Sequence, residues 1–205
     1  MTLLLAAAVA YLIGSISFAV LVSRAYGLPD PRSYGSGNPG ATNVLRTGRK
    51  AAAALTLAGD ALKGWFAVLL VGQHVVAEPL AAGVAAVAVV MGHMWPLYFR
   101  FTGGKGVSTA LGALIALDLW LAAGTIATWL VIALFFRYSS LAALVAAAFA
   151  VFFAFFLHGM GRFPVEQAIG VAVIGALLVW RHRGNIRNLL AGTEGKLGSS
   201  RTGSA

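Results

Sequence analysis

The stretch TLLLAAAVAYLIGSISFAVLV, from Thr2 to Val22, is almost entirely apolar and is long enough to cross a bilayer as a helix. The first basic residue, Arg24, follows this run, whereas a cleaved signal peptide carries its basic residues before the apolar segment. We therefore expect an uncleaved first membrane helix. The composition agrees, because 60% of the 205 residues are apolar, 10% are charged and the mean hydropathy is +0.86. A soluble domain is typically about half apolar and a quarter charged.

Six further apolar runs follow, and each is predicted to be a helix: 51–71, 79–92, 107–117, 119–136, 141–157 and 164–180. The run at 107–117 is too short to span the membrane unless its helix begins inside the preceding polar segment. Of the fifteen Lys and Arg residues, thirteen lie in the segments after the first, third, fifth and seventh runs. Because cytoplasmic loops are enriched in Lys and Arg, this asymmetry predicts seven transmembrane helices, with the N-terminus outside and the C-terminus in the cytoplasm.

The predicted fold is therefore all-α and integral to the membrane, with short or re-entrant motif-bearing segments on the cytoplasmic side. We expect residues 1–198 to form a single domain and residues 199–205 to be a disordered tail. The net charge of +9 follows from the cytoplasmic loops, so we expect no nucleic-acid partner. There is no cysteine, and four scattered histidines and six carboxylates make a dedicated metal site improbable. We expect no cofactor.

Three polar stretches share the predicted cytoplasmic side and are rich in glycine and in basic or amide side chains. They are SYGSGNPGATNVLR from Ser33 to Arg46, GHMWPLYFRFTGGKGVST from Gly92 to Thr109, and HRGNIRNLLAGTE from His182 to Glu194. Glycine lets successive backbone N–H groups converge on an anion, and Arg and Lys supply charge suited to phosphate. Their common side predicts a single phosphate-binding site. The second stretch is not a Walker loop, because Phe99 and Gly106 replace the required glycine and hydroxyl residues.

Four further residues have two interpretations each. Asp60 and Lys63 are three residues apart within the second run and share a helix face, so they form either a structural pair or part of the site. His93 and His182 each lie where a cytoplasmic polar stretch meets a helix end. Either histidine could be a structural hydrogen-bonding residue or a member of the site.

Taken together, the three stretches resemble the membrane-integral glycerol-3-phosphate acyltransferases of bacteria that use acyl phosphate as donor, the PlsY family. The family motif SxxSGNPGxTN with a nearby Arg matches 33–46, GHxxPxxxxFxGGKGVxT matches 92–109, HxxNIxxLxxGxE matches 182–194, and DxxKG matches 60–64. The motifs occur in the family's order along nearly the whole chain before the tail. Thr102 and Asn188 stand where many members carry a basic residue.

The resemblance implies a multi-pass enzyme of the bacterial inner membrane, working in phospholipid biosynthesis with its site facing the cytoplasm. It would transfer a fatty acyl group from acyl phosphate to the 1-hydroxyl of sn-glycerol 3-phosphate, giving 1-acyl-sn-glycerol 3-phosphate and phosphate. Its partners would be these two substrates and the lipid bilayer. The implied catalytic residues are Ser33, Lys105, His182, Asn185 and Glu194. The implied substrate-binding residues are Ser36, Gly37, Asn38, Gly40, Thr42, Asn43, Arg46, Arg49, His93, Gly103, Gly104 and Gly106.

By the same resemblance, Lys105 and His93 would hold glycerol 3-phosphate, while Ser33, Arg46 and the 37–43 amides would hold phosphate oxygens. His182 and Asn185 would orient the reacting centre, with Glu194 bracing His182 or a neighbouring Arg. The general base is either His182 or the substrate's own phosphate.

Two other functions remain open at this point. A transporter or channel for phosphorylated solutes could use the same cradles, although no repeated pair of broken helices is evident. A coenzyme A-dependent acyltransferase is a second alternative, but the chain lacks the His-x4-Asp pair and a nucleotide-binding loop. No sequence pattern indicates an oligomeric state.

Overall fold

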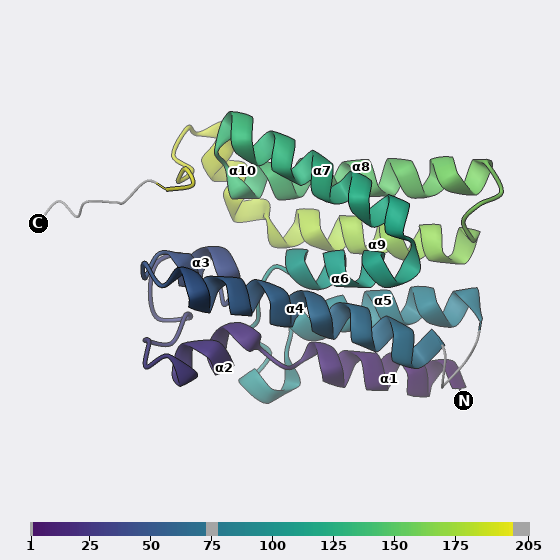
Figure 1. Ribbon diagram of the computed structural model, residues 1–205, viewed down its shortest axis with the longest axis horizontal. Coiled ribbons are helices and arrows are strands. Elements are labelled where there is room, and N and C mark those ends of the chain that lie inside the picture. The colour runs from purple at the N-terminus through teal and green to yellow at the C-terminus, as the bar shows by residue number, and fades with distance from the viewer. Residues whose placement is uncertain (1, 73–77, 199–205) are drawn as a thin grey trace, which may run out of the picture.

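The computed structural model describes residues 2–72 and 78–198, and within these residues the regular structure is helical, without a strand. The predicted tail lies outside the described residues. The longer helices run roughly along one common axis (Figure 1). In chain order the elements are α1 Thr2–Gly14, α2 Phe18–Ala25, α3 Ala41–Leu45, α4 Lys50–Leu70, α5 Pro79–Met94, the 3₁₀ helix η2 Leu97–Phe99, α6 Val107–Leu117, α7 Leu119–Phe136, α8 Ser139–Gly159, α9 Val165–Arg181 and α10 Arg183–Leu190.

The apolar segments differ in how much of a membrane they can cross. Five of the described segments are long and apolar enough to span it: Leu3–Ala25, Lys50–Leu70, Pro79–Phe99, Leu119–Phe136 and Ser139–Gly159. The helices α9 and α10 pass the same test together, but the chain bends by 58° between them. Helix α6 has 11 residues and begins at Val107, so it does not extend back into the polar segment. All seven predicted runs are helical, and seven complete crossings stay a prediction.

The first apolar segment is not the single continuous helix expected from its composition. Helix α1 ends at Gly14 and α2 begins at Phe18, while Ser15 Oγ donates to a carbonyl one turn earlier at 2.9 Å. At the break, the carbonyl of Ile16 accepts a hydrogen bond from Lys63 Nζ on α4 at 2.5 Å. The interruption therefore supplies a backbone acceptor to a charged side chain inside the bundle, where an unpaired ammonium is costly.

Helices α4 and α6 approach so closely that side chains are excluded between them. A Cβ atom at Gly64 would overlap the Thr109 carbonyl, and one at Gly112 would overlap the Ala61 carbonyl. Small residues at such crossings let the two backbones pack directly against each other. Close packing of this kind drives helix association in membranes, because the hydrophobic effect does not favour contact between helices in lipid. This contact fixes the start of α6, and with it the glycine-rich loop, against α4.

The bundle has two parts, with α1, α2, α4, α5 and α6 on one side and α7, α8, α9 and α10 on the other (Figure 1). Contacts of α9 with α5 and of α6 with α7 join them. Large apolar side chains point outward, with Leu4, Leu134 and Phe135 exposed by 78%, 75% and 80%. Such surfaces are expected in lipid and would be unfavourable in water.

The polar stretches gather toward one end of the bundle. The α2–α4 connection, the start of α10 and the segment after it lie at the left of Figure 1, with the α5–α6 connection set deeper on the same side. The α8–α9 connection lies at the opposite end. The three motifs, separated by up to about 150 residues in the sequence, are therefore close enough to contribute to one site.

Candidate active site

The first motif forms a loop organised around a buried asparagine. Asn43 is 1% exposed; its Oδ1 accepts the N–H of Ser36 at 3.0 Å, and its Nδ2 donates to the carbonyls of Pro31 and Tyr34 at 2.7 and 3.2 Å. Gly35 has a φ of +60° and lies against the Asn43 amide, where a side chain would collide. Asn43 thus uses its polar atoms within the loop and shapes it.

Other residues of the first motif remain available at the surface. Ser33 Oγ donates to the Asp30 carbonyl at 2.8 Å and can still accept. Thr42 Oγ1 lies 3.4 Å from Ser139 Oγ at the start of α8. The side chains of Arg46 and Arg49 are exposed, as are several neighbouring polar positions: Ser33, Ser36, Gly37 and Thr42. Asn38 and Gly40 are partly exposed and adjoin one another in the turn before α3.

The second motif is a glycine loop closed by an arginine. Arg181 at the end of α9 donates from Nη2 to the carbonyls of Gly103 and Gly104 at 2.8 and 2.9 Å, and from Nε to Gly104 at 3.1 Å. The Gly104 N–H returns to the His93 carbonyl at 3.1 Å. Gly106, with a φ of +87°, turns the chain into α6. The carbonyls of Gly103 and Gly104 accept hydrogen bonds from Arg181. The groups of this segment that can bind an anion are therefore the backbone N–H groups in the first turn of α6, which have no partner within the helix.

Beneath that loop lies a buried polar network that includes three of the four residues with two interpretations: Asp60, Lys63 and His93. Lys63 Nζ lies 2.8 Å from Asp60 Oδ1 and 3.0 Å from His93 Nδ1, and Thr109 Oγ1 lies 3.1 Å from the same nitrogen. An ammonium only donates, so His93 Nδ1 is the acceptor and Nε2 carries the proton. That Nε2 lies against Gly104. His93 is 7% exposed, so it supports the glycine loop from below.

The third motif is connected to the second by a chain of short hydrogen bonds. Lys105 Nζ donates to Asn185 Oδ1 at 2.6 Å, and Asn185 Nδ2 donates to Glu194 Oε1 at 2.6 Å. Ser140 Oγ on α8 donates to the same carboxylate oxygen at 2.5 Å. Glu194 therefore braces Asn185 and α8, which differs from the expected partner, His182 or an arginine. The network orients the Lys105 ammonium through a neutral amide.

His182 occupies the bend between α9 and α10 and is 2% exposed. Its Nδ1 lies 2.7 Å from the carbonyl of Leu178. A carbonyl only accepts, so Nδ1 carries the proton in the neutral ring and Nε2 keeps an unshared pair. That tautomer is the one a general base requires.

The electrostatics of the site are dominated by cations. Arg181 and Arg46 both repel the Lys105 ammonium, whereas Glu194 is the carboxylate among the described residues that attracts it. Burial lowers the pKa of Lys105 below its usual range, and the two arginines add to this effect while Glu194 opposes it. An arrangement with this excess positive charge favours a multiply charged anion such as a phosphate monoester. The described residues contain no cluster of three or more His, Cys, Asp or Glu side chains that could hold a metal.

Two participants were not predicted from the sequence. Arg181 looked like an ordinary basic residue at the end of a span, although its place beside His182 was an available signal. Ser140 lies in the Ser-Ser pair that opens α8 and carries no motif of its own. Both act through polar contacts made across the bundle.

A model of the family described as glycerol-3-phosphate acyltransferase matches residues 4–192. The chain belongs to this family. A glycerol-3-phosphate acyltransferase of Burkholderia lata is 59% identical over 205 residues, covering 100% of this chain and 95% of the relative. The crystal structure of PlsY (YgiH), an integral membrane glycerol 3-phosphate acyltransferase in its glycerol 3-phosphate form, superposes with a TM-score of 0.87 at 39% identity. It covers 97% of this chain and 96% of that one.

The lysophosphatidic acid form of that protein gives a TM-score of 0.86 at 38% identity, with the same coverage. These likenesses confirm the family predicted from the motifs, and the chain is a membrane acyltransferase of the glycerol-3-phosphate type. The family assignment also argues against the transporter alternative. Individual site residues of this glycerol-3-phosphate acyltransferase stay predictions, informed by the contacts above.

Proposed function

We propose that this protein transfers a fatty acyl group from acyl phosphate to the 1-hydroxyl of sn-glycerol 3-phosphate and releases inorganic phosphate. The observation that carries the proposal is the hydrogen-bonded chain from Lys105 through Asn185 to Glu194, which joins two of the motifs beside a glycine loop. Both substrates carry a phosphate, and the site offers separate cationic and backbone donors from the first and second motifs.

The acceptor phosphate would lie at the second motif. Lys105 has three ammonium protons, and Asn185 occupies one of them, so two remain for phosphate oxygens. The loop backbone is held open by Arg181 and by the support of His93 from below. Gly103, Gly104 and Gly106 allow a ligand to approach the backbone closely.

The donor phosphate would lie at the first motif. Arg46 and Ser33 face the surface there, with Ser36, Gly37, Asn38, Gly40 and Thr42 forming the surrounding loop. A side chain at Gly195, next to Glu194, would come within 4.0 Å of the Arg46 guanidinium, so this arginine lies next to the third motif. We assign Asn43 and His93 to positioning these loops, since both are consumed by internal contacts. Arg49 would contribute long-range attraction, because its exposed side chain makes no hydrogen bond within the described residues.

The transfer requires no enzyme-bound intermediate. The 1-hydroxyl oxygen attacks the acyl carbonyl carbon, a new ester C–O bond forms, and the bond from that carbon to the phosphate oxygen breaks with departure of phosphate. The hydroxyl proton passes to His182 Nε2 or to a substrate phosphate oxygen. Positioning of the two substrates and stabilisation of developing negative charge by Lys105 and Arg46 then supply most of the acceleration. No step calls for a metal or an organic cofactor.

We also propose the full topology: seven membrane crossings within a single domain of residues 1–198, with the N-terminus outside and the motifs and C-terminus in the cytoplasm of a bacterial inner membrane. The distribution of basic residues supports this orientation. The gathering of the polar segments toward one end of the bundle supports their placement on a common side (Figure 1).

The donor is tested with purified protein, sn-glycerol 3-phosphate and either long-chain acyl phosphate or acyl coenzyme A, in buffer with a metal chelator. We expect lysophosphatidate and one equivalent of inorganic phosphate from acyl phosphate alone. A Lys105→Met variant serves as a control for contaminating activity. Turnover with acyl coenzyme A but not with acyl phosphate would refute the proposed donor while leaving the family assignment intact.

A further inference from the structure

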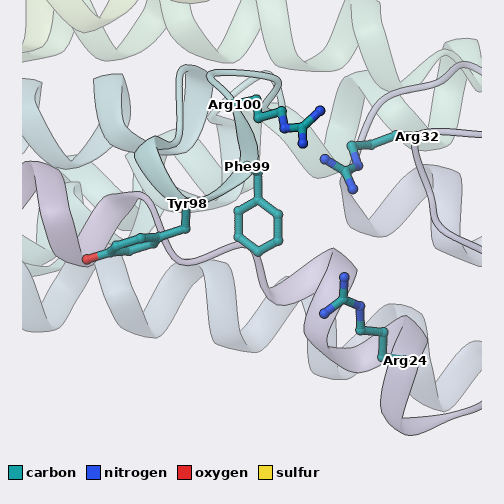
Figure 2. A pocket seen from close by; sticks show the side chains of 5 residues that line it. All are labelled: Arg24, Arg32, Tyr98, Phe99 and Arg100. Atoms are coloured by element: carbon teal, nitrogen blue, oxygen red, sulfur yellow. The ribbon is translucent and has the colours of Figure 1, made fainter.

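A basic pocket lies between the end of α2 and the η2 turn, away from α10 (Figure 1). Its volume is about 510 Å³, and its lining residues are Arg24, Arg32, Tyr98, Phe99 and Arg100. Figure 2 shows the guanidinium groups of Arg32 and Arg100 directed toward one another, with Arg24 pointing toward them from α2. No reaction step described above uses these residues. We call this site the arginine pocket.

The arginine pocket has an excess of positive charge within a small volume. Arg32 is paired with Asp30 through Nε and Nη2 at 2.6–3.2 Å, and this bond holds the pKa of the Asp30 carboxyl below its usual range. Arg24 and Arg100 form no salt bridge with any carboxylate in the part of the chain that the structure describes. Three guanidinium groups against one carboxylate leave a net charge of +2. Like charges at short range repel, so an anion between them would be strongly favoured.

The pocket is preorganised. The Asp30 pair and the ring of Phe99, 5.6 Å from the guanidinium carbon, hold Arg32 in place while its Nη1 donors stay open to the pocket. Arg100 and Phe101 have φ values of +52° and +59°, in the left-handed region that non-glycine residues rarely adopt. Bonds from the N–H of Phe101 to Pro96 and from Thr102 to Phe99 maintain this turn. Strained backbone that presents a charged side chain to a pocket is typical of a binding site.

The location identifies the environment of the ligand. Helix α2 is the last part of the membrane-crossing segment Leu3–Ala25. Around the pocket, Tyr26, Tyr98 and Phe101 are exposed, as expected of aromatic side chains at a membrane–water interface. Basic pockets at the cytoplasmic ends of membrane helices bind anionic headgroups, because guanidinium forks match phosphate oxygens.

We propose that the arginine pocket binds a phosphate group at the membrane surface, carried either by an anionic phospholipid or by free phosphate. None of the residues that line the pocket is assigned to a substrate above. The pocket adjoins the first motif, because the Asp30 carbonyl accepts the Ser33 hydroxyl at 2.8 Å, whereas Lys105, Asn185 and Glu194 are linked to one another and to α8. The proposal therefore does not depend on the identity of the acyl donor.

The test compares the parent protein with an Arg24→Gln/Arg100→Gln double variant in detergent. Arg187→Gln is the matched control, since it removes an exposed arginine from α10. Each protein is titrated with dioctanoyl phosphatidylglycerol, with inorganic phosphate, and with zwitterionic dioctanoyl phosphatidylcholine. The thermal unfolding midpoint is measured at each ligand concentration, and the concentration that gives half of the maximal shift is taken as the affinity. Because the reacting centre also binds phosphate, only differences between the parent and the variants are assigned to the pocket.

We expect the double variant to bind phosphatidylglycerol or inorganic phosphate, whichever occupies the pocket, at least roughly tenfold more weakly than the parent protein does. The reason is the loss of charge-assisted hydrogen bonds from the two arginines. Weaker binding of phosphatidylglycerol would identify a lipid headgroup, and weaker binding of inorganic phosphate would identify the free ion. An Arg24→Lys/Arg100→Lys variant should recover part of the affinity, which a simple folding defect would not allow. Equal affinities of the parent and the double variant for both anions would overturn the proposal.

Discussion

Replacing Lys105 by methionine tests the central contact of the proposed site. Methionine is unbranched and similar in length, so the change removes the charge while preserving most of the volume. Lys105 Nζ keeps two donors beyond its 2.6 Å bond to Asn185. Each charge-assisted hydrogen bond to a phosphate contributes about 1.5–3 kcal/mol and methionine can donate none, so binding of glycerol 3-phosphate should weaken by at least roughly ten- to hundredfold. The Michaelis constant for glycerol 3-phosphate should rise by that factor.

The assay follows lysophosphatidate formation while each substrate is varied in turn. The Michaelis constant for the acyl donor should change far less, since Arg46 and the first motif are assigned to it. Lys50→Met, which removes an exposed lysine at the start of α4, should leave both constants unchanged. Lys105→Arg keeps the charge and should restore much of the acceptor affinity. An unaltered acceptor constant in Lys105→Met would refute the role of Lys105 as a phosphate ligand.

Three further outcomes follow from the contacts. Burial lowers the pKa of Lys105, so its charge is lost at a lower pH than in an exposed lysine, and kcat/KM for glycerol 3-phosphate should fall at a correspondingly lower pH on the alkaline side. In Lys105→Arg this alkaline fall should move to higher pH, and identical alkaline profiles of the two proteins would contradict the assignment. Lys63→Met removes the ammonium from the buried Asp60 carboxylate and leaves His93 Nδ1, at 3.4 Å, as the remaining partner. The loss should cost about 3–5 kcal/mol and lower the thermal midpoint, and an unchanged midpoint would exclude a structural pair. In intact cells a cysteine introduced at Met160 should react with a membrane-impermeant thiol reagent, and one introduced at Thr102 should not. The reverse labelling pattern would show that the proposed topology is wrong.

Much of the helical architecture could be predicted from run length alone. Residues 119–136 match the predicted helix to the residue, because Asp118 caps it and the chain turns at Arg137. The common side of the motifs was also predictable, since it depends only on where the basic residues fall. Both features depend on the local sequence, because a long apolar run forms a helix in the membrane whichever segments pack against it.

The departures come from contacts between distant segments. Gly14 and Ser15 are a local signal for a kink, but the residue that bonds to the carbonyl of Ile16 at the break is Lys63, 47 positions away. His93 could equally have faced a ligand or the core, and Lys63 with Thr109 place it in the core network. Arg181 could be recognised as a clamp only once α9 was seen beside the glycine loop. Pattern and propensity do not encode these pairings.

The bond from Lys63 to the carbonyl of Ile16 also has a consequence for biogenesis. In hydrocarbon an interrupted helix is tolerated when its freed backbone groups find a partner, and here part of that partner resides on α4. Because the first segment is synthesised before α4, we expect it to reach its final shape only after α4 has been inserted. Lys63 and Asp60 in turn enter lipid as a pair that neutralises itself. We therefore expect the insertion of the first two apolar segments to be coupled, with α4 fixing the shape of the segment made before it.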